Sequence, residues 1–348
     1  MAETAGGTKG QVRHPILHGG NLDAARAAFP QAPEPWVDLS TGINPWPYPL
    51  PAIPAAAWTR LPGGAEEEAL RVAAAACYGA PSPAHAAAAP GSQALIQWLP
   101  RLRRPGRVTV LGPTYAEHAR AWAATGHTVR IVDGVADLEG DVAVIVNPNN
   151  PDGRIIDRAE LLALAERFSA RGGWLVVDEA FADVVPEASV CDAVDRPGLI
   201  VLRSFGKFFG LAGVRLGVAL AAEPLATRIR DAVGPWAVPG PTLAVATRAL
   251  RDDSWIVAAR QQLAAAAASF DLRLSSLGLP VVGGTPRYRL VRHTHATQIV
   301  NALGRAGLLV RRFDEHPEWL RFGLPADDAA QQRLMRAMES MVDKSNSL

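Results

Sequence analysis

Four polar segments of this 348-residue chain hold residue types that could do chemistry, and each directly follows a predicted strand. Ligands of open α/β sheets bind beyond the carboxyl ends of the strands. Lysine amines form Schiff bases, carboxylates hold protons, and arginines and helix N-termini bind phosphate groups. The four segments are PGSQ (90–93), NPNNPDG (147–153), DEAFAD (178–183) and SFGKFFGLAGVRLG (204–217).

The elements that must position these segments are short apolar runs separated by helical patterns. Strands that are continuously apolar and spaced by helices predict a mostly parallel sheet with both faces covered. The predicted helices are 66–77, 92–101, 116–125 and 157–171. The predicted strands are 85–89, 108–112, 128–132, 142–146, 174–178, 199–203 and 214–220.

The pattern changes after residues 234–235 and predicts a smaller α+β unit. The first 55 residues are rich in proline and glycine, which favours an extended arm with turns over a helix. We therefore expect an arm that covers the substrate (1–50), a large domain (51–234) and a small C-terminal domain (235–348). In the small domain, residues 241–278 look helical, strands are predicted at 288–292, 308–312 and 319–323, and a final helix at 327–342.

Composition excludes several classes of protein. Apolar residues make up 49% and charged residues 20%, which excludes a disordered chain. The net charge is +1, so nothing favours a nucleic-acid or membrane partner. Cys77 and Cys191 are too few for a disulfide framework, and Met1–Gly10 contains no apolar signal core. We expect a soluble, cytoplasmic protein.

Each polar segment also has a simpler explanation when it is taken alone. Gly91 and Ser92 could cap a helix, and residues 147–153 could be only a turn-rich loop. Asp178 could be surface charge, and Lys207 a solvated lysine. Together, however, Lys207 placed 29 residues after Asp178 and followed by LAG and an arginine resembles the pyridoxal-phosphate enzymes of the aspartate aminotransferase fold (fold type I). The resemblance extends over nearly the whole chain.

The resemblance implies a role for each matching position. Lys207 would form the Schiff base with pyridoxal 5'-phosphate, and Asp178 would keep the ring nitrogen protonated so that the ring accepts electrons. Asn150 would donate to the phenolic oxygen, and Tyr115 would lie on the ring face. Arg321, in WLRFG, would hold the substrate carboxylate. The residues implied for the phosphate cup are Gly91, Ser92, Gln93, Ser204 and Arg215.

Two positions depart from the pattern of many relatives. Phe181 stands where a tyrosine usually donates to the phenolic oxygen, so Asn150 would carry more of that interaction. Leu61 and Pro62 stand where a Tyr-Pro motif reaches the phosphate of the partner subunit. The fold still implies a homodimer.

Three segments narrow the resemblance to one branch. HGGN (18–21), LSTGINP (39–45) and the segment around Lys207 are similar to the threonine-phosphate decarboxylases of cobalamin biosynthesis, with histidinol-phosphate aminotransferase as the alternative. DEAF, in place of the aminotransferase's usual DEAY, favours the decarboxylases. These enzymes convert L-threonine O-3-phosphate to (R)-1-amino-2-propanol O-2-phosphate and carbon dioxide.

The branch also implies a substrate site. Arg311 matches the position that pairs with the substrate phosphate, and Arg312 is the alternative because neighbouring strand residues point to opposite faces. His18 could equally be an ordinary loop histidine. The residues implied for the substrate are His18, Gly19, Gly42, Asn44, Asn150, Arg311 and Arg321.

Three competing interpretations find less support in the sequence. Ser204-x-x-Lys207 fits the S-x-x-K motif of penicillin-binding proteins, but neither S-D-N nor K-T-G occurs. A transcription regulator with an aminotransferase-like sensor would need a recognition helix that the first 55 residues do not offer. A metal site at His293 and His295 has no third ligand nearby in sequence, so we expect no metal.

Overall fold

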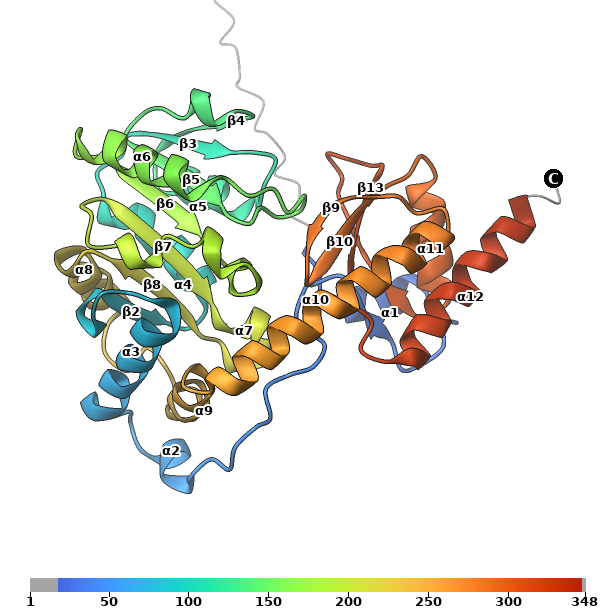
Figure 1. Cartoon of the computed structure of the whole chain (residues 1–348), viewed down its shortest axis with the longest axis horizontal. Helices are drawn as coiled ribbons and strands as arrows, with labels where there is room; N and C mark the ends of the chain where they lie inside the picture. Colours follow the sequence, from blue (N-terminus) through green and yellow to red (C-terminus); the bar gives the residue numbers. More distant parts are fainter. Residues whose placement is uncertain (1–17, 346–348) are drawn as a thin grey trace, which may run out of the picture.

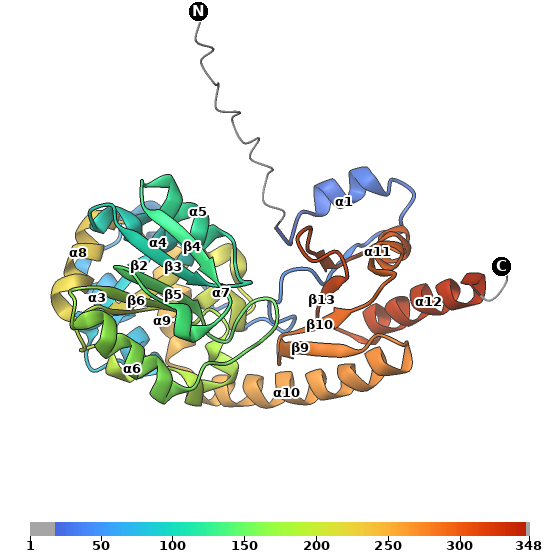
Figure 2. The ribbon, with the colours of Figure 1, turned by 90° about the horizontal axis from the view of Figure 1, so that it is seen from above.

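The computed structural model describes residues 18–345, with the side chains of the last helix described up to Glu339. The N-terminal segment for which we expect no signal core lies outside this range, as do the first 17 residues of the predicted arm. Two sheets, each with its own helices, stand side by side and are bridged by one long helix, α10 (Asp253–Ser276) (Figures 1 and 2).

The larger sheet confirms the prediction of a mostly parallel α/β layer. Its strand order is β2-β8-β7-β6-β5-β3-β4, and β8 alone runs antiparallel to its two neighbours. The strands are β2 (Ala86–Ala89), β3 (Arg107–Leu111), β4 (Thr128–Val132), β5 (Val142–Val146), β6 (Trp174–Asp178), β7 (Leu199–Ser204) and β8 (Gly217–Ala221).

Helices cover both faces of this sheet, which explains why its central strands are continuously apolar. Along β5, Val142 and Val144 belong to one buried cluster, whereas Ala143 and Ile145 belong to the other. Side chains of a strand alternate between faces, so each face has its own core. The helices of this layer are α3 (Gly64–Tyr78), α4 (Ser92–Trp98), α5 (Glu117–Ala124), α6 (Arg158–Ser169), α8 (Glu223–Val233) and α9 (Gly240–Leu250).

The smaller sheet is antiparallel, with the order β12-β13-β10-β9. It packs with α10, α11 (Ala296–Arg305) and α12 (Asp328–Ser345). A separate pairing of β1 (Val37–Asp38) with β11 (Leu308–Leu309) ties the N-terminal segment to this unit. The strands are β9 (Val281–Thr285), β10 (Tyr288–Arg292), β12 (Arg311–Arg312) and β13 (Trp319–Gly323).

The structure differs from the sequence prediction at several places. Helices α8 and α11 were not predicted, and the predicted strand 308–312 is divided into β11 and β12, which belong to different sheets. Residues Leu22–Ala28 form α1 in the predicted extended arm, because the Asn21 side chain accepts a hydrogen bond from the Ala24 N–H and caps the helix. The single predicted helix 241–278 is two helices, since Asp252 caps α10 at Trp255 N–H. Strand β9 was not predicted. The arm, large and small domain boundaries remain a prediction.

Short helices and turns connect the longer elements. The short α-helices among these connections are α2 (Ala55–Thr59) and α7 (Phe205–Phe208). The 3-10 helices are η1 (Pro83–His85), η2 (Leu99–Leu102), η3 (Val135–Asp137), η4 (Ala182–Val184), η5 (Pro186–Ala188), η6 (Cys191–Ala193) and η7 (Ala212–Val214).

The β9–β10 hairpin holds the small sheet against the loop that follows β5. Gly284 N–H donates to the Asp152 carbonyl at 2.8 Å, and the Tyr288 hydroxyl donates to the Asn149 carbonyl at 2.5 Å. A Cβ atom on Gly153 would lie 2.0 Å from the Gly284 carbonyl oxygen, so only glycine allows this approach. The carboxyl ends of the large sheet therefore face the small sheet.

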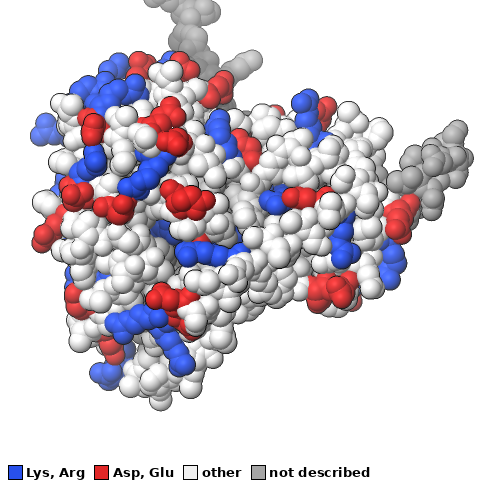
Figure 3. All heavy atoms as spheres, viewed as in Figure 1, with Lys and Arg blue, Asp and Glu red and all other residues white. Residues whose placement is uncertain are grey.

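The distribution of charge on the surface agrees with the net charge of +1. Acidic and basic side chains are interspersed over the face drawn in Figure 3, without a field of a single sign. Within residues 18–345, no helix has the length and apolarity needed to cross a membrane.

Candidate functional site

Lys207 lies on α7, directly after β7, at the carboxyl end of the large sheet. Its side chain is half-buried, and its Nζ lies 5.4 Å from the centroid of the Phe181 ring. Burial, with a smaller contribution from the cations Arg321 and Arg287, lowers the pKa of Lys207 to about 8, and Asp178 acts in the opposite direction. Because a neutral amine is the nucleophilic form, this environment favours attack on a carbonyl group near neutral pH.

Asp178 ends β6 and is 3% exposed. One carboxylate oxygen accepts from Ala180 N–H at 3.0 Å, and the other lies 2.8 Å from Nε2 of the buried His118. Asp178 is thus oriented from two sides. Our sequence analysis missed His118. The signal was its position three residues after Tyr115 at the start of a helix, which places both side chains on one face.

The segments of the predicted phosphate cup have unusual backbone conformations and approach one another closely. Gly91 has φ of +91°, and a Cβ atom there would lie 2.7 Å from Nη2 of Arg215. Arg215 itself adopts a left-handed φ of 55°, which is unusual for a residue with a side chain. Ser204 pairs with Gly217, and a Cβ atom on Gly217 would lie 2.2 Å from the Ser92 nitrogen.

This geometry fits a phosphate group. The chain keeps open a cradle of backbone N–H groups at the start of α4, with a guanidinium beside it. Strain of the kind seen at Arg215 is characteristic of functional sites.

A hydrogen-bond chain runs from Tyr115 to the N-terminal segment. The Tyr115 hydroxyl donates to Gln93 Oε1 at 3.2 Å, and Gln93 Nε2 donates to Glu117 at 3.1 Å. Glu117 is buried, and its other oxygen lies 3.3 Å from Nε2 of His18. The chain therefore links three predicted site residues through Glu117, which our sequence analysis did not single out.

Arg321, on β13, is buried beside the loop after β5. Its Nη1 donates to Asn150 Oδ1 at 2.5 Å and its Nη2 to the Ser40 carbonyl at 2.6 Å, while Nε has no partner. Arg311 is the direct cross-strand neighbour of Arg321, so both arginines lie on the same face. Arg312 is exposed and pairs with Asp314. Arg311, not Arg312, therefore shares a face with Arg321.

The N-terminal segment contributes backbone more than side chains. The Asn44 amide donates to the Phe208 carbonyl at 2.9 Å, and Asn44 N–H donates to the Lys207 carbonyl. Asn44 thus holds the turn that presents Lys207. Gly42 has φ of +64° and lies where a Cβ atom would be 3.4 Å from the Phe181 ring. Gly19 packs on Ser40, because a Cβ atom on Gly19 would lie 2.5 Å from the Ser40 carbonyl oxygen.

The two departures from the family pattern occupy different surroundings. Phe181 is buried, with its ring edge-on to Tyr288 at 5.0 Å. Leu61 is 65% exposed on the surface of the protomer.

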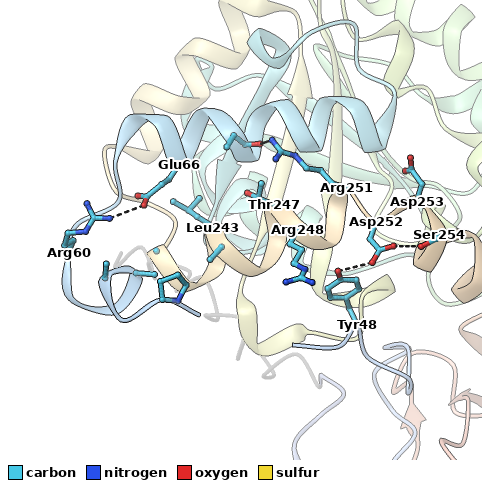
Figure 4. A pocket seen from close by; sticks show the side chains of 16 residues that line it. Tyr48, Arg60, Glu66, Leu243, Thr247, Arg248, Arg251, Asp252, Asp253 and Ser254 are labelled. Carbon is cyan, nitrogen blue, oxygen red and sulfur yellow. Dashed lines mark hydrogen bonds and ion pairs between the residues drawn. The ribbon is translucent and has the colours of Figure 1, made fainter. Parts of the chain in front are cut away.

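A cavity of about 840 Å³ lies away from these residues, between α2, α3, α9 and the start of α10 (Figure 4). Arg60 and Glu66 pair at one end, and the Tyr48 hydroxyl donates to Asp252 at the other. None of the predicted site residues lines it, so the chemistry does not belong to this cavity.

Comparisons with known proteins agree with this geometry. The family model described as aminotransferase class I and II matches residues 58–338. The threonine-phosphate decarboxylase of Pseudomonas aeruginosa is 49% identical over 328 residues, covering 93% of this chain and 97% of that protein. The enzyme of the same name from a Sinorhizobium species is 45% identical over 335 residues, covering 94% and 98%.

Solved structures share the fold at lower identity. The histidinol-phosphate aminotransferase of Sinorhizobium meliloti, solved in complex with pyridoxal-5'-phosphate, matches with a TM-score of 0.77 at 20% identity, covering 94% of this chain and 96% of that one. The fold is thus that of the type I pyridoxal-phosphate enzymes. The chain belongs to the aminotransferase class I and II family, and within it to the threonine-phosphate decarboxylase family of enzymes.

Proposed function

We propose that the protein decarboxylates L-threonine O-3-phosphate to (R)-1-amino-2-propanol O-2-phosphate and carbon dioxide, with pyridoxal 5'-phosphate as cofactor, in cobalamin (adenosylcobalamin) biosynthesis. The names of two relatives at 45% and 49% identity support the reaction. The single observation that carries the proposal is the pair Arg311 and Arg321 on one face of the small sheet, beside Asn150.

The residues that would hold the cofactor surround Lys207. Lys207 would bind its aldehyde, and Asp178, oriented by His118, would keep a proton on its ring nitrogen. Asn150 would donate to its phenolic oxygen and Tyr115 would cover its ring. Its phosphate would occupy the cup formed by Gly91, Ser92, Gln93, Ser204 and Arg215.

The two arginines suit a substrate with two anionic ends. Arg321 would bind the carboxylate, since its Nε is buried without a partner and its side chain is held by Asn150 and Ser40. Arg311 has lost part of its hydration, and burial lowers its pKa, so a phosphate dianion beside it would gain a strong charge-assisted bond. His18 and the backbone of Gly19, Gly42 and Asn44 would line the same site.

Two anchors also determine which bond at the α-carbon breaks. When bound, the cofactor supplies a sink for the electron pair left at that carbon. Arg311 and Arg321 would restrict rotation of the substrate, and a misplacement of ~1 Å costs ~10²-fold in rate. Lys207 would return a proton to the α-carbon and complete the amine product.

The first experiment separates decarboxylation from transamination. The purified protein is incubated with L-threonine O-3-phosphate, with and without 2-oxoglutarate, while carbon dioxide and glutamate are measured. We expect carbon dioxide release that does not depend on 2-oxoglutarate. Glutamate formation without carbon dioxide would instead support the alternative, an aminotransferase such as histidinol-phosphate aminotransferase.

Matched substitutions test the two anchors. Arg311→Ala is expected to raise KM for the phosphorylated substrate by roughly ten- to a hundredfold, because a charge-assisted bond contributes about 1.5–3 kcal/mol. Arg312→Ala removes the same charge one residue away, from the exposed face, and should leave KM within about twofold. Equal effects of both substitutions would contradict the assignment.

Lys207→Ala tests the cofactor link. We expect loss of the visible absorbance of the cofactor-bound protein and loss of turnover, because the amine is the only covalent partner proposed. The chain has three lysines, Lys9, Lys207 and Lys344, so Lys344→Ala is a matched control that should keep both. Retained absorbance and activity in Lys207→Ala would refute the assignment.

We further propose that the protein acts as a cytoplasmic homodimer. Leu50, Trp58 and Leu61 are each more than 60% exposed and lie close together in sequence, on and beside α2. Large exposed apolar side chains are typical of an interface, and a second copy of the chain would cover them. Light scattering after size exclusion should give twice the mass of 36.9 kDa, and a monomer would exclude the proposal.

A further inference from the structure

Arg287 is a completely buried cation that none of the proposed steps uses. It stands in the turn between β9 and β10 and is 0% exposed. Its Nη2 donates to the Ala180 carbonyl at 2.8 Å, but its Nε and Nη1 have no hydrogen-bond partner. Among the described residues no carboxylate forms an ion pair with it, and the carboxylate of Asp183 is held by Arg203.

An unpaired buried charge is costly, so its retention calls for a physical role. Buried arginines are almost always paired, because desolvation of an ion costs several kcal/mol. Burial lowers the pKa of Arg287 to about 10, which still leaves the guanidinium charged at neutral pH. Unusual charges of this kind gather at functional sites.

The position of Arg287 connects it with Lys207 through one aromatic ring. The guanidinium carbon of Arg287 lies 4.6 Å from the centroid of the Phe181 ring, and Lys207 Nζ lies 5.4 Å from the same centroid. Phe181 is 2% exposed, so its ring is an apolar neighbour of both groups that is almost completely removed from solvent. Charges separated by such apolar material interact much more strongly than charges in water.

We propose that Arg287 is a positioning residue for the reaction, whose fixed positive charge, held against Phe181, disfavours a second positive charge on Lys207 and so keeps that amine neutral and nucleophilic. The inference rests on the proposed role of Lys207. It also gives a reason for phenylalanine at position 181, because both cations lie near an apolar ring that carries no hydroxyl group.

Other charged groups also act on Lys207, and their roles differ. Asp178 favours the charged amine, whereas Arg321 and Arg215 disfavour it. In the proposed function, Arg321 would be neutralised by the substrate carboxylate and Arg215 by the cofactor phosphate. Arg287 has no such ligand, so its effect persists when the site is filled. Three further titratable groups surround the site, namely Tyr115, His118 and Tyr288.

The test is a direct titration of Lys207 in the full-length protein freed of cofactor. Because the chain has only three lysines, ¹³C-methyl labelling of lysine amines gives few NMR signals, and the Lys207 signal is assigned by its absence in Lys207→Ala. In Arg287→Met we expect the titration midpoint of Lys207 to rise by about one pH unit, an approximately tenfold gain in proton affinity.

Two variants separate charge from packing. Arg287→Gln removes the charge but leaves a polar side chain, and it should raise the midpoint as Arg287→Met does. Arg289→Met removes an arginine two residues further along, on β10, but Arg289 is already paired with Asp271 at 2.5 Å, so the midpoint should not move.

The outcomes decide the proposal in either direction. A midpoint in Arg287→Met equal to that of the wild type would overturn it, and so would a lower melting temperature without a shift, which would show a purely structural role. If Arg287→Met does not fold, Arg287→Gln provides the same reading, because it also removes the charge but keeps a polar donor in the side chain. This titration does not depend on which substrate the enzyme takes, so failure of the decarboxylase assignment would be seen separately.

Discussion

At the scale of single residues, the site depends on side chains whose partners lie far away in sequence. Asp178 and His118 are 60 positions apart and both are buried, so the carboxylate exchanges water for one imidazole and one backbone donor. Lys207 has no carboxylate of its own within ion-pair distance among the described residues. The surroundings of the two groups thus differ: two donors hold the carboxylate of Asp178, whereas no carboxylate pairs with the amine of Lys207 among the described residues.

The contact between His118 and Asp178 leads to a prediction. His118→Phe keeps the ring volume but removes the donor, which leaves one oxygen of a buried carboxylate unsatisfied at a cost of about 1–3 kcal/mol. We expect the dissociation constant of pyridoxal 5'-phosphate to rise by about one order of magnitude in an absorbance titration. His127→Phe is the control, because His127 is also buried but accepts from the Gly106 N–H and donates to the Pro100 carbonyl instead. Equal affinity in both variants would contradict the role of His118.

At the scale of elements, the proposed phosphate cup depends on how closely β8 approaches the start of α4. Gly217 lies on β8, and its hydrogen atom occupies the space where a Cβ would be 2.2 Å from the Ser92 nitrogen. Gly91 plays the same part toward Arg215. The cup is therefore built from small residues on two elements, and its N–H groups stay open because no side chain fills the gap.

A substitution on β8 tests this close approach. Gly217→Ala should displace the start of α4, lower the melting temperature by several degrees and weaken phosphate binding by about tenfold or more, since overpacking costs about 1–3 kcal/mol. Gly213→Ala, four residues earlier, meets nothing within 4 Å and should leave both quantities unchanged. Isothermal titration with pyridoxal 5'-phosphate measures the difference. An unchanged affinity in Gly217→Ala would show that the cup lies elsewhere.

At the scale of the whole molecule, the small sheet completes a site that the large sheet begins. The β9–β10 hairpin contacts the loop after β5 through Gly284 and Tyr288, and the same sheet supplies Arg311 and Arg321. The proposed substrate anchors and Lys207 thus come from different layers. Their separation is determined by the packing of the two sheets, which α10 bridges (Figure 2).

The hairpin contact gives a prediction about substrate binding. Tyr288→Phe removes the hydroxyl that donates to the buried Asn149 carbonyl and loosens the neighbour of Asn150, which holds Arg321. We expect KM for the phosphorylated substrate to rise by roughly three- to tenfold, since a lost bond of this kind costs about 1 kcal/mol. Tyr48→Phe loses a hydroxyl bonded to Asp252 at the distant cavity, and should change stability without changing KM.

Much of the fold could be predicted because its signals are local. The strands of the large sheet are continuously apolar, and β5 and β6 lie where the sequence predicts them. The prediction failed where capping decided the outcome, as with Asn21 at α1 and Asp252 at α10, because one side-chain oxygen outweighs a proline-rich or helical context. Strand β9, with two glycines, has little strand propensity and is formed through its contacts with β10 and Asp152.

For the site, the sequence by itself determined the chemical types and their order along the chain. Lys207, Asp178 and the glycines of the cup could be named because reactive groups follow strand ends, and the scarcity of lysine was a further signal that we did not use. Only the tertiary structure decided which of Arg311 and Arg312 faces Arg321, that His118 supports Asp178, and that Arg287 lies behind Phe181. These contacts depend on how the separate sheets pack, and the sequence pattern of one segment does not determine its distance from another segment.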